Sequence, residues 1–222
     1  MKRFEIKFIL NSHEVFQLKE ALISKTTFKK TYDPRYVNSL YFDDINNMSA
    51  ADNLSGISKR KKYRLRWYGK HLIDQIKFEI KNRKNKIGYK EYYDFSEDPE
   101  TLKKLRLSDI AKMLERKLEL EKKVFTPPLF PRLQLDYLRE YYENSAGIRL
   151  TIDNQIRFWP AYEFSSIFYG APLSYDKEIV ELKFSKELYP NAVNFIRNTK
   201  LLPKRHSKYL IGLAKLGEAK YI

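Results

Sequence analysis

The sequence predicts an α+β fold in which helices flank an antiparallel sheet. Five segments alternate charged and apolar residues with a period of two, which is typical of strands with one polar face. Other stretches carry apolar residues at helical spacing. The chain has 222 residues, of which 43% are hydrophobic, so it can bury a substantial core. We therefore expect a single domain over residues 1–222.

The clearest strand pattern is a basic hairpin that runs from Arg60 to Lys81 around a turn at Gly69. Alternate side chains of a strand point to opposite faces, so its first strand lines up four basic groups about 7 Å apart. These are Arg60, Lys62, Arg64 and Arg66. The second strand puts Glu79 and Lys81 on one face, opposite Phe78 and Ile80. For one hairpin alone, a solvated face over an apolar core is the simpler interpretation.

The elements before the hairpin alternate between strand and helix. Residues 2–10 read as a first strand, with Glu5 and Lys7 on its charged side. Asn11 or Ser12 is expected to cap a helix with an apolar stripe. Residues 36–43 read as a second strand and residues 44–54 as a short helix.

The elements after the hairpin repeat this theme. Residues 84–95 predict a turn at Gly88 and a short strand, and residues 96–123 a broken helical stripe that Ser96 caps. Strands are predicted at residues 132–142, 147–158 and 178–184, and helices at residues 190–200 and 207–217. Gly212 and Gly217 have the spacing of a phosphate-binding P-loop, but Glu218 and Ala219 follow where Lys and Ser or Thr are required. That motif is excluded, and both glycines are expected to end a helix.

The composition limits the chemistry. Lys and Arg number 43 against 28 Asp and Glu, a net charge of +15, which implies a polyanionic partner such as nucleic acid, an anionic membrane or a phosphate chain. The absence of cysteine excludes disulfides, thiolate metal sites and a thiol nucleophile. Because no apolar run reaches the ~20 residues that span a bilayer and no signal peptide is evident, we expect a cytoplasmic protein without a transmembrane segment.

The charged faces leave two arrangements open. Five predicted strands carry charged residues on one face. These residues are Glu5/Lys7, the Arg60–Arg66 ladder, Glu79/Lys81, Arg149/Thr151/Asp153 and Glu181/Lys183. An antiparallel sheet with a solvated outer face produces this pattern, and so does a barrel with a polar interior. Arginine is prominent and lies beside glutamate, and arginine is the preferred residue for bidentate phosphate contacts. The pattern by itself supports both arrangements equally.

A family resemblance favours the second arrangement. The motifs RFEIK, NSLYFDD, RLRWYG, FEIK, DYLRE, IRLTID, VELK and HSKYL follow in this order between Arg3 and Gly212. Together they resemble the VTC domain (vacuolar transporter chaperone), the polyphosphate-polymerase branch of the triphosphate tunnel metalloenzymes, in the CYTH-like superfamily. The resemblance implies an antiparallel β-barrel tunnel with a polar, basic interior and flanking helices. It also implies transfer of the terminal phosphoryl group of ATP to a growing polyphosphate chain.

The resemblance further implies roles for individual residues. The phosphate-binding positions of the reaction centre are Lys7, Arg64, Arg66, Lys81, Arg139 and Arg149. Further basic positions are Lys183, Arg205 and Lys208, with Arg60 and Lys62 at the tunnel mouth. Glu181 matches the metal-binding glutamate, for Mn²⁺ or Mg²⁺, and Glu5 is a second candidate ligand. Glu79 is expected to pair with neighbouring basic residues, and Asn53 stands where members often carry a basic residue.

Three other functions remain alternatives at this point. A hydrolase of triphosphate or polyphosphate would use the same residues, with water in place of the phosphate chain. A non-catalytic polyphosphate-binding subunit would need only the basic positions. A nucleic-acid-binding module would use an exposed basic face and need no metal. The polymerase implies ATP and inorganic polyphosphate as partners, no nucleic acid, and allows a membrane-protein partner.

Overall fold

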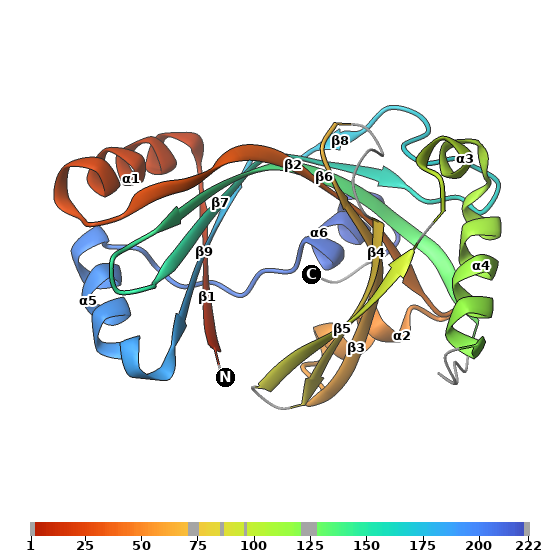
Figure 1. Cartoon of the computed structure of the whole chain (residues 1–222), viewed down its shortest axis with the longest axis horizontal. Helices are drawn as coiled ribbons and strands as arrows, with labels where there is room; N and C mark the ends of the chain where they lie inside the picture. The colour runs from red at the N-terminus through yellow and green to blue at the C-terminus, as the bar shows by residue number, and fades with distance from the viewer. Residues whose placement is uncertain (1–2, 71–75, 85–86, 96, 121–127, 220–222) are drawn as a thin grey trace. The chain divides into compact units, whose positions relative to one another are not determined.

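The computed structural model describes residues 3–70, 76–84, 87–95, 97–120 and 128–219 (Figure 1). Its strands are β1 (Arg3–Leu10), β2 (Lys29–Asp43), β3 (Lys59–Tyr68), β4 (Ile76–Lys84), β5 (Ile87–Phe95), β6 (Phe130–Glu143), β7 (Arg149–Pro160), β8 (Leu173–Ser174) and β9 (Glu178–Ser185). Its helices are α1 (Ser12–Lys25), α2 (Met48–Leu54), α3 (Pro99–Lys104), α4 (Leu107–Leu120), α5 (Tyr189–Thr199) and α6 (Lys208–Lys215), with a 3₁₀ turn at Lys186–Leu188.

The strands form one sheet in the order β1-β9-β7-β6-β2-β3-β4-β5, and β8 pairs with β7. The pairs β1–β9, β2–β3, β3–β4, β4–β5 and β7–β9 are antiparallel. The predicted α+β fold with an antiparallel sheet and flanking helices is thereby confirmed. The sheet is not closed by hydrogen bonds, since β1 and β5 end the order of the described strands.

Residue contacts divide the chain into two compact units. Unit 1 comprises residues 1–36, 137–156 and 174–207, and unit 2 comprises residues 37–136, 157–173 and 208–222. β2, β6, β7 and β8 each contribute residues to both units. Each unit has its own hydrophobic core.

In unit 1 the helices α1 and α5 cover the apolar face of β1, β7 and β9 (Figure 1). Phe8, Leu150 and Leu182 are fully buried on that face. Asn11 caps α1 through a capping box with Glu14, as the sequence predicts. Because successive strand residues alternate, the charged residues that alternate with this core lie on the other face of the sheet, namely Glu5, Lys7, Arg149, Asp153, Glu181 and Lys183.

In unit 2 the helices α3 and α4 pack along the apolar face of β2 to β5 (Figure 1). The buried residues of this core are Leu40, Phe42, Leu65, Trp67, Phe78, Ile80, Leu102, Ile110, Leu114 and Leu118, among others. The parity predicted for the basic hairpin is confirmed, because Leu65, Phe78 and Ile80 are buried. Residues 71–75 of its connection lie outside the described residues.

Several local predictions need correction. The strand expected at residues 36–43 begins earlier, at Lys29. The helix expected from Asp44 begins at Met48, because the carboxylates of Asp43 and Asp44 accept backbone N–H groups of the intervening turn and of the start of α2. The stripe at residues 96–123 is two helices, and Asp98 caps the first one; Ser96 and residues 121–123 lie outside the described residues.

The prediction that Gly212 ends a helix is wrong, because this residue lies inside α6. A Cβ atom at this position would come within 2.6 Å of Leu133 and 2.8 Å of Phe158, so the missing side chain permits close packing of α6 on β6 and β7. Gly217 follows α6 with a φ of 78°, a conformation that favours glycine at a helix end.

Candidate functional site

Glu181 of β9 is the centre of the charged cluster of unit 1. Its Oε1 lies 3.2 Å from Lys7 Nζ, and its Oε2 lies 2.8 Å from Lys183 Nζ and 3.8 Å from Arg139 Nη2. The carboxylate is buried, with 8% of the side chain exposed. β1 and β9 bring Lys7 and Glu181 together because these two residues are direct partners in the antiparallel register.

Lys7 connects Glu181 to a second carboxylate. Its Nζ lies 3.2 Å from Glu5 Oε1 and donates to the carbonyl oxygen of His206 at 3.3 Å. Burial disfavours the charge of Lys7, but the attraction of Glu181 and Glu5 holds its pKa above the ordinary value. Lys7 is therefore a permanently charged group at neutral pH. The contact with His206 places the segment before α6 beside β1.

Arg139 of β6 is held by an acid that the sequence did not identify as its partner. Its Nε donates to Asp153 Oδ1 at 2.5 Å and its Nη2 to Asp153 Oδ2 at 2.7 Å. Asp153 is fully buried, and Arg139 is 12% exposed. Although burial lowers it, the pKa of Arg139 is raised well above its usual value, chiefly by Asp153. This bidentate pair fixes the plane of the guanidinium on the same face of the sheet as Glu181.

The other predicted residues of unit 1 lie at the edge of this cluster or outside it. Arg149 is the register partner of Lys183 in the β7–β9 pair, but its side chain is half-exposed and pairs with Glu143 at 3.3 Å. Arg205 is exposed in the segment that leads to α6. Lys7, Arg139, Glu181, Lys183 and Glu5 are thus brought together, whereas Arg149 and Arg205 contact other parts of unit 1 or solvent.

The carboxylates of Glu5 and Glu181 fit a divalent ion. In the β1–β9 register Glu5 pairs with Lys183 and Lys7 with Glu181, so the two glutamates are diagonal neighbours on one face. One ammonium group, that of Lys7, lies within 3.2 Å of both, which shows that a cation can reach both acids. Within the described residues no group of three or more Asp, Glu or His side chains is gathered for a metal. Mg²⁺ is commonly held by one or two carboxylates together with substrate phosphates and water, so this donor pair suits a site that the substrate completes.

Unit 2 carries its own charged cluster, centred on Glu79 of β4. Arg64 Nε donates to Glu79 Oε2 at 2.8 Å, Arg66 Nη1 lies 3.9 Å from Oε1, and Lys90 Nζ lies 3.5 Å from Oε2. Burial alone would raise the pKa of Glu79, but Arg64 and Arg66 lower it to about 2. The prediction that Glu79 pairs with neighbouring basic residues agrees with this geometry.

A row of three lysines crosses the strands next to Glu79. Lys62 of β3 is the register partner of Lys81 of β4, which in turn is the partner of Lys90 of β5. Like charges directly opposite one another destabilise a sheet, so this row is unfavourable unless an anion neutralises it. Desolvation and the charge of Arg64 lower the pKa of Lys90 to about 7. Lys90 was not predicted from the sequence, because the turn was expected at Gly88, and Gly88 in fact lies within β5.

Two tyrosines anchor the basic residues of unit 2. Arg64 Nη1 donates to the hydroxyl of Tyr41 at 3.1 Å, and the Tyr41 ring stacks on that of Tyr209 with centroids 4.9 Å apart. Tyr209 donates to Asp43 Oδ2 at 2.8 Å, and the Lys62 ammonium lies 5.9 Å from its ring. Burial raises the pKa of Tyr41, but Arg64 and Arg66 reverse the shift and lower it. The stack fixes α6 on β2.

The remaining predicted positions of unit 2 lie on α6, β3 and α2. Lys208 begins α6, one residue before Tyr209, and its charge contributes to the lowered pKa of Tyr41. Arg60 donates to the carbonyl oxygen of Ile57, at the start of β3. Asn53 lies on α2, half-buried.

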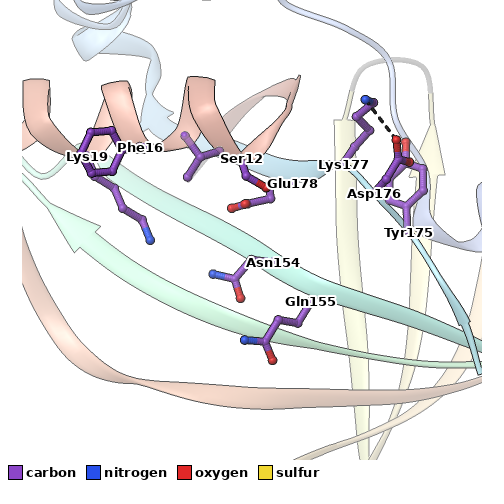
Figure 2. A pocket seen from close by; sticks show the side chains of 10 residues that line it. Ser12, Phe16, Lys19, Asn154, Gln155, Tyr175, Asp176, Lys177 and Glu178 are labelled. Carbon is purple, nitrogen blue, oxygen red and sulfur yellow. Dashed lines mark ion pairs between the residues drawn. The ribbon is translucent and has the colours of Figure 1, made fainter.

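A pocket of about 480 Å³ lies on the opposite face of β7 from Asp153 (Figure 2). It is lined by residues of α1, β7, the segment before β9 and the first residue of β9, and the predicted site residues are not among those that line it. Figure 2 shows Asn154 and Gln155 in this pocket below α1, with Lys177 paired to Asp176 at 3.1 Å. Neighbouring strand residues point to opposite faces, so Asn154 faces α1 while Asp153 faces Arg139. We therefore place the site at the charged clusters and not in this pocket.

Comparison with known proteins agrees with this fold. A family model described as the VTC domain matches residues 2–217. The structure is similar to that of HpAC1 from Hippeastrum, an adenylyl cyclase candidate described as having a dominant triphosphatase activity. The TM-score is 0.57, and the two sequences are 16% identical over 99% of this chain and 97% of that one. No curated protein matches the sequence.

Two bacterial structures described as adenylate cyclase candidates are also similar. The one from Bacillus halodurans has a TM-score of 0.56 and 12% identity, over 93% of this chain and 96% of that one. The one from Vibrio parahaemolyticus has a TM-score of 0.54 and 10% identity, over 95% and 98%. At these identities the likeness shows the fold. Among the helices that the structure describes, none is long and apolar enough to cross a membrane.

Proposed function

Because the chain belongs to the VTC domain family, we propose that it is a polyphosphate polymerase. In this reaction the bond between the β- and γ-phosphates of ATP breaks, and the terminal oxygen of a polyphosphate chain takes the γ-phosphoryl group. The products are ADP and a chain longer by one phosphate. Such a transfer needs positioning and charge neutralisation more than covalent chemistry by the protein.

The observation that carries the proposal is the row of lysines in unit 2. Lys62, Lys81 and Lys90 lie opposite one another with Arg64 and Arg66 alongside, and both arginines pair with Glu79. A surplus of charge on a half-buried sheet face suits a ligand with closely spaced negative charges. Phosphate oxygens meet this requirement, and arginine and lysine bind them by charge-assisted hydrogen bonds.

Unit 1 supports the same proposal with a different chemistry. Arg139, Lys7 and Lys183 would bind and orient phosphate oxygens, and their geometry is already fixed by Asp153 and Glu181. Glu181 and Glu5 would hold Mn²⁺ or Mg²⁺, which when bound supplies positive charge to phosphate oxygens. Preorganised charges of this kind are the main means by which proteins accelerate phosphoryl transfer.

Hydrolysis of triphosphate is the second candidate, because HpAC1 has this fold and is described as having triphosphatase activity. Purified protein incubated with ATP and Mn²⁺ would be analysed for long chains on a gel and for free phosphate in solution. We expect long chains and ADP. Free phosphate without chains would assign the hydrolase, and tight binding of polyphosphate without either product would assign a binding subunit.

Phosphate binding is expected to depend on pH through Lys90. Its pKa of about 7 lies below the ordinary value for lysine, so near pH 8 most of the protein holds this side chain neutral. A bound polyanion favours the charged form and raises the pKa, so binding at pH 8 takes up close to one proton at Lys90, and the affinity falls as the pH rises through 7.

Calorimetry with tripolyphosphate in buffers of different ionisation enthalpy would count these protons. Lys90→Met is the control, because it removes this proton while the ligand's own titration remains. Equal proton uptake by the wild type and Lys90→Met at pH 8 would contradict the assignment.

A further inference from the structure

An exposed group of aromatic and basic side chains lies beside Arg139 in unit 1. It consists of Tyr32 and Arg35 of β2 and Tyr141 of β6. The rings of Tyr32 and Tyr141 meet edge to face with centroids 5.7 Å apart. Arg35 donates from Nε to the Tyr141 hydroxyl at 3.0 Å, and its guanidinium carbon lies 5.2 Å from the ring centroid. Tyr32 leaves 67% of its surface in solvent.

This group is on the same face of the sheet as the charged cluster. Tyr141 is two residues after Arg139 in β6, so both side chains point to one face, about 7 Å apart along the strand. The alternate residues Glu140 and Tyr142 point to the opposite face. They are hydrogen-bonded to each other, and Glu140 pairs with Lys19 of α1. Glu143, next on the face of Tyr141, pairs with Arg149.

The contacts of this group hold Tyr141 in place and leave Tyr32 exposed. Tyr141 is fixed by Arg35 on its hydroxyl and by the edge-to-face contact with Tyr32, whereas Tyr32 is largely open. A rigid aromatic ring with an open face and an adjacent guanidinium is the arrangement on which nucleobases stack. In a nucleoside triphosphate the ribose separates the base from the phosphates, so a base platform is expected beside a phosphate site and not within it.

We propose that Tyr32, Arg35 and Tyr141 form the platform on which the base of ATP stacks while its phosphates bind at Arg139, Lys7 and Lys183. The inference rests on the proposed function and adds to it the element that distinguishes a nucleotide from inorganic phosphate chains. Stacking selects for ring area and not for hydrogen-bonding pattern. Purine nucleotides should therefore bind more tightly than pyrimidine nucleotides, with little difference between ATP and GTP.

Two ligands test this platform separately from the phosphate site. Binding of ATP and of tripolyphosphate, which has no base, would be measured by calorimetry for the wild type, Tyr141→Leu and Tyr32→Ser. We expect each substitution to raise the Kd for ATP by about 5- to 100-fold and to change the Kd for tripolyphosphate less than two-fold. Tyr141→Phe, which keeps the ring, should retain ATP affinity.

The matched control is Tyr162→Ser, which removes an exposed tyrosine of unit 2 that is 61% exposed. It should leave both ligands unaffected, and thermal unfolding would verify that each variant is folded. Unchanged ATP binding by Tyr141→Leu and Tyr32→Ser would overturn the platform, and so would equal losses for ATP and tripolyphosphate. If the wild type bound neither ligand, the proposed function itself would fail, and the platform with it.

Discussion

Glu181→Gln is expected to reduce turnover by about 10²- to 10³-fold while triphosphate binding is kept or strengthened. The carboxylate contacts Lys7, Lys183 and Arg139 together, and it is the proposed ligand of the divalent ion. Glutamine keeps the shape and accepts hydrogen bonds, but it removes the negative charge. The three cations then face an incoming polyanion with one internal carboxylate fewer, since only Glu5 and Asp153 still pair with Lys7 and Arg139, so affinity does not fall even though catalysis does.

Turnover would be measured with ATP and Mn²⁺, and affinity with tripolyphosphate in the absence of metal. Glu143→Gln is the matched control, since this glutamate also pairs with an arginine on the same face but is one-third exposed. It should leave turnover within about two-fold, because an exposed ion pair contributes little. Near-wild-type turnover of a folded Glu181→Gln protein would refute the metal assignment.

Arg139→Met is expected to lower the free energy of unfolding by about 3–5 kcal/mol, because it leaves the fully buried carboxylate of Asp153 without its bidentate partner. The long apolar side chain fills most of the volume of the arginine, so the loss arises from the unpaired charge and not from a cavity. Denaturant unfolding of the wild type and the variant measures this difference.

The double variant Arg139→Met/Asp153→Asn tests whether the loss of stability arises from the unpaired charge of Asp153. Removing the buried charge as well should recover a large part of the stability while phosphate binding remains impaired. Arg149→Met is the control for the loss of an arginine on the same face, and because Arg149 is half-exposed we expect an effect below about 1 kcal/mol. Equal stabilities for Arg139→Met and Arg149→Met would contradict the structural role of Asp153.

Strand parity made much of this site predictable from the sequence. The alternation of Arg64 and Arg66 with Leu65, and of Glu181 with Leu182, assigned each residue to the polar or the apolar face. The hydrophobic cores, which contain Leu65 and Leu182, confirm that assignment. Parity follows from backbone geometry alone, so it needs no knowledge of neighbouring strands.

Pairing between strands could not be predicted in the same way. Asp153 was assigned to the charged face, but its bond to Arg139 depends on how β6 and β7 align. Lys90 was overlooked because its position matters only through its register with Lys81. The helix after β2 was placed too early because the side chains of Asp43 and Asp44 bind the backbone of the turn. The spacing of apolar residues does not reveal such side-chain to backbone hydrogen bonds, which compete with helix formation.

Phosphate binding at the charged faces requires that the phosphate replace a carboxylate of the protein as the partner of the basic side chains. Glu79 and Glu181 already accept charge-assisted bonds from two or more cations, so an incoming anion has to displace a carboxylate that is held within the protein. An isolated phosphate ion gains little from such a displacement, because it replaces one anion by another. A chain of linked phosphates displaces several contacts while losing translational freedom only once. Each cluster should therefore discriminate by the number of linked phosphates, with affinity that rises steeply from phosphate to tripolyphosphate and beyond.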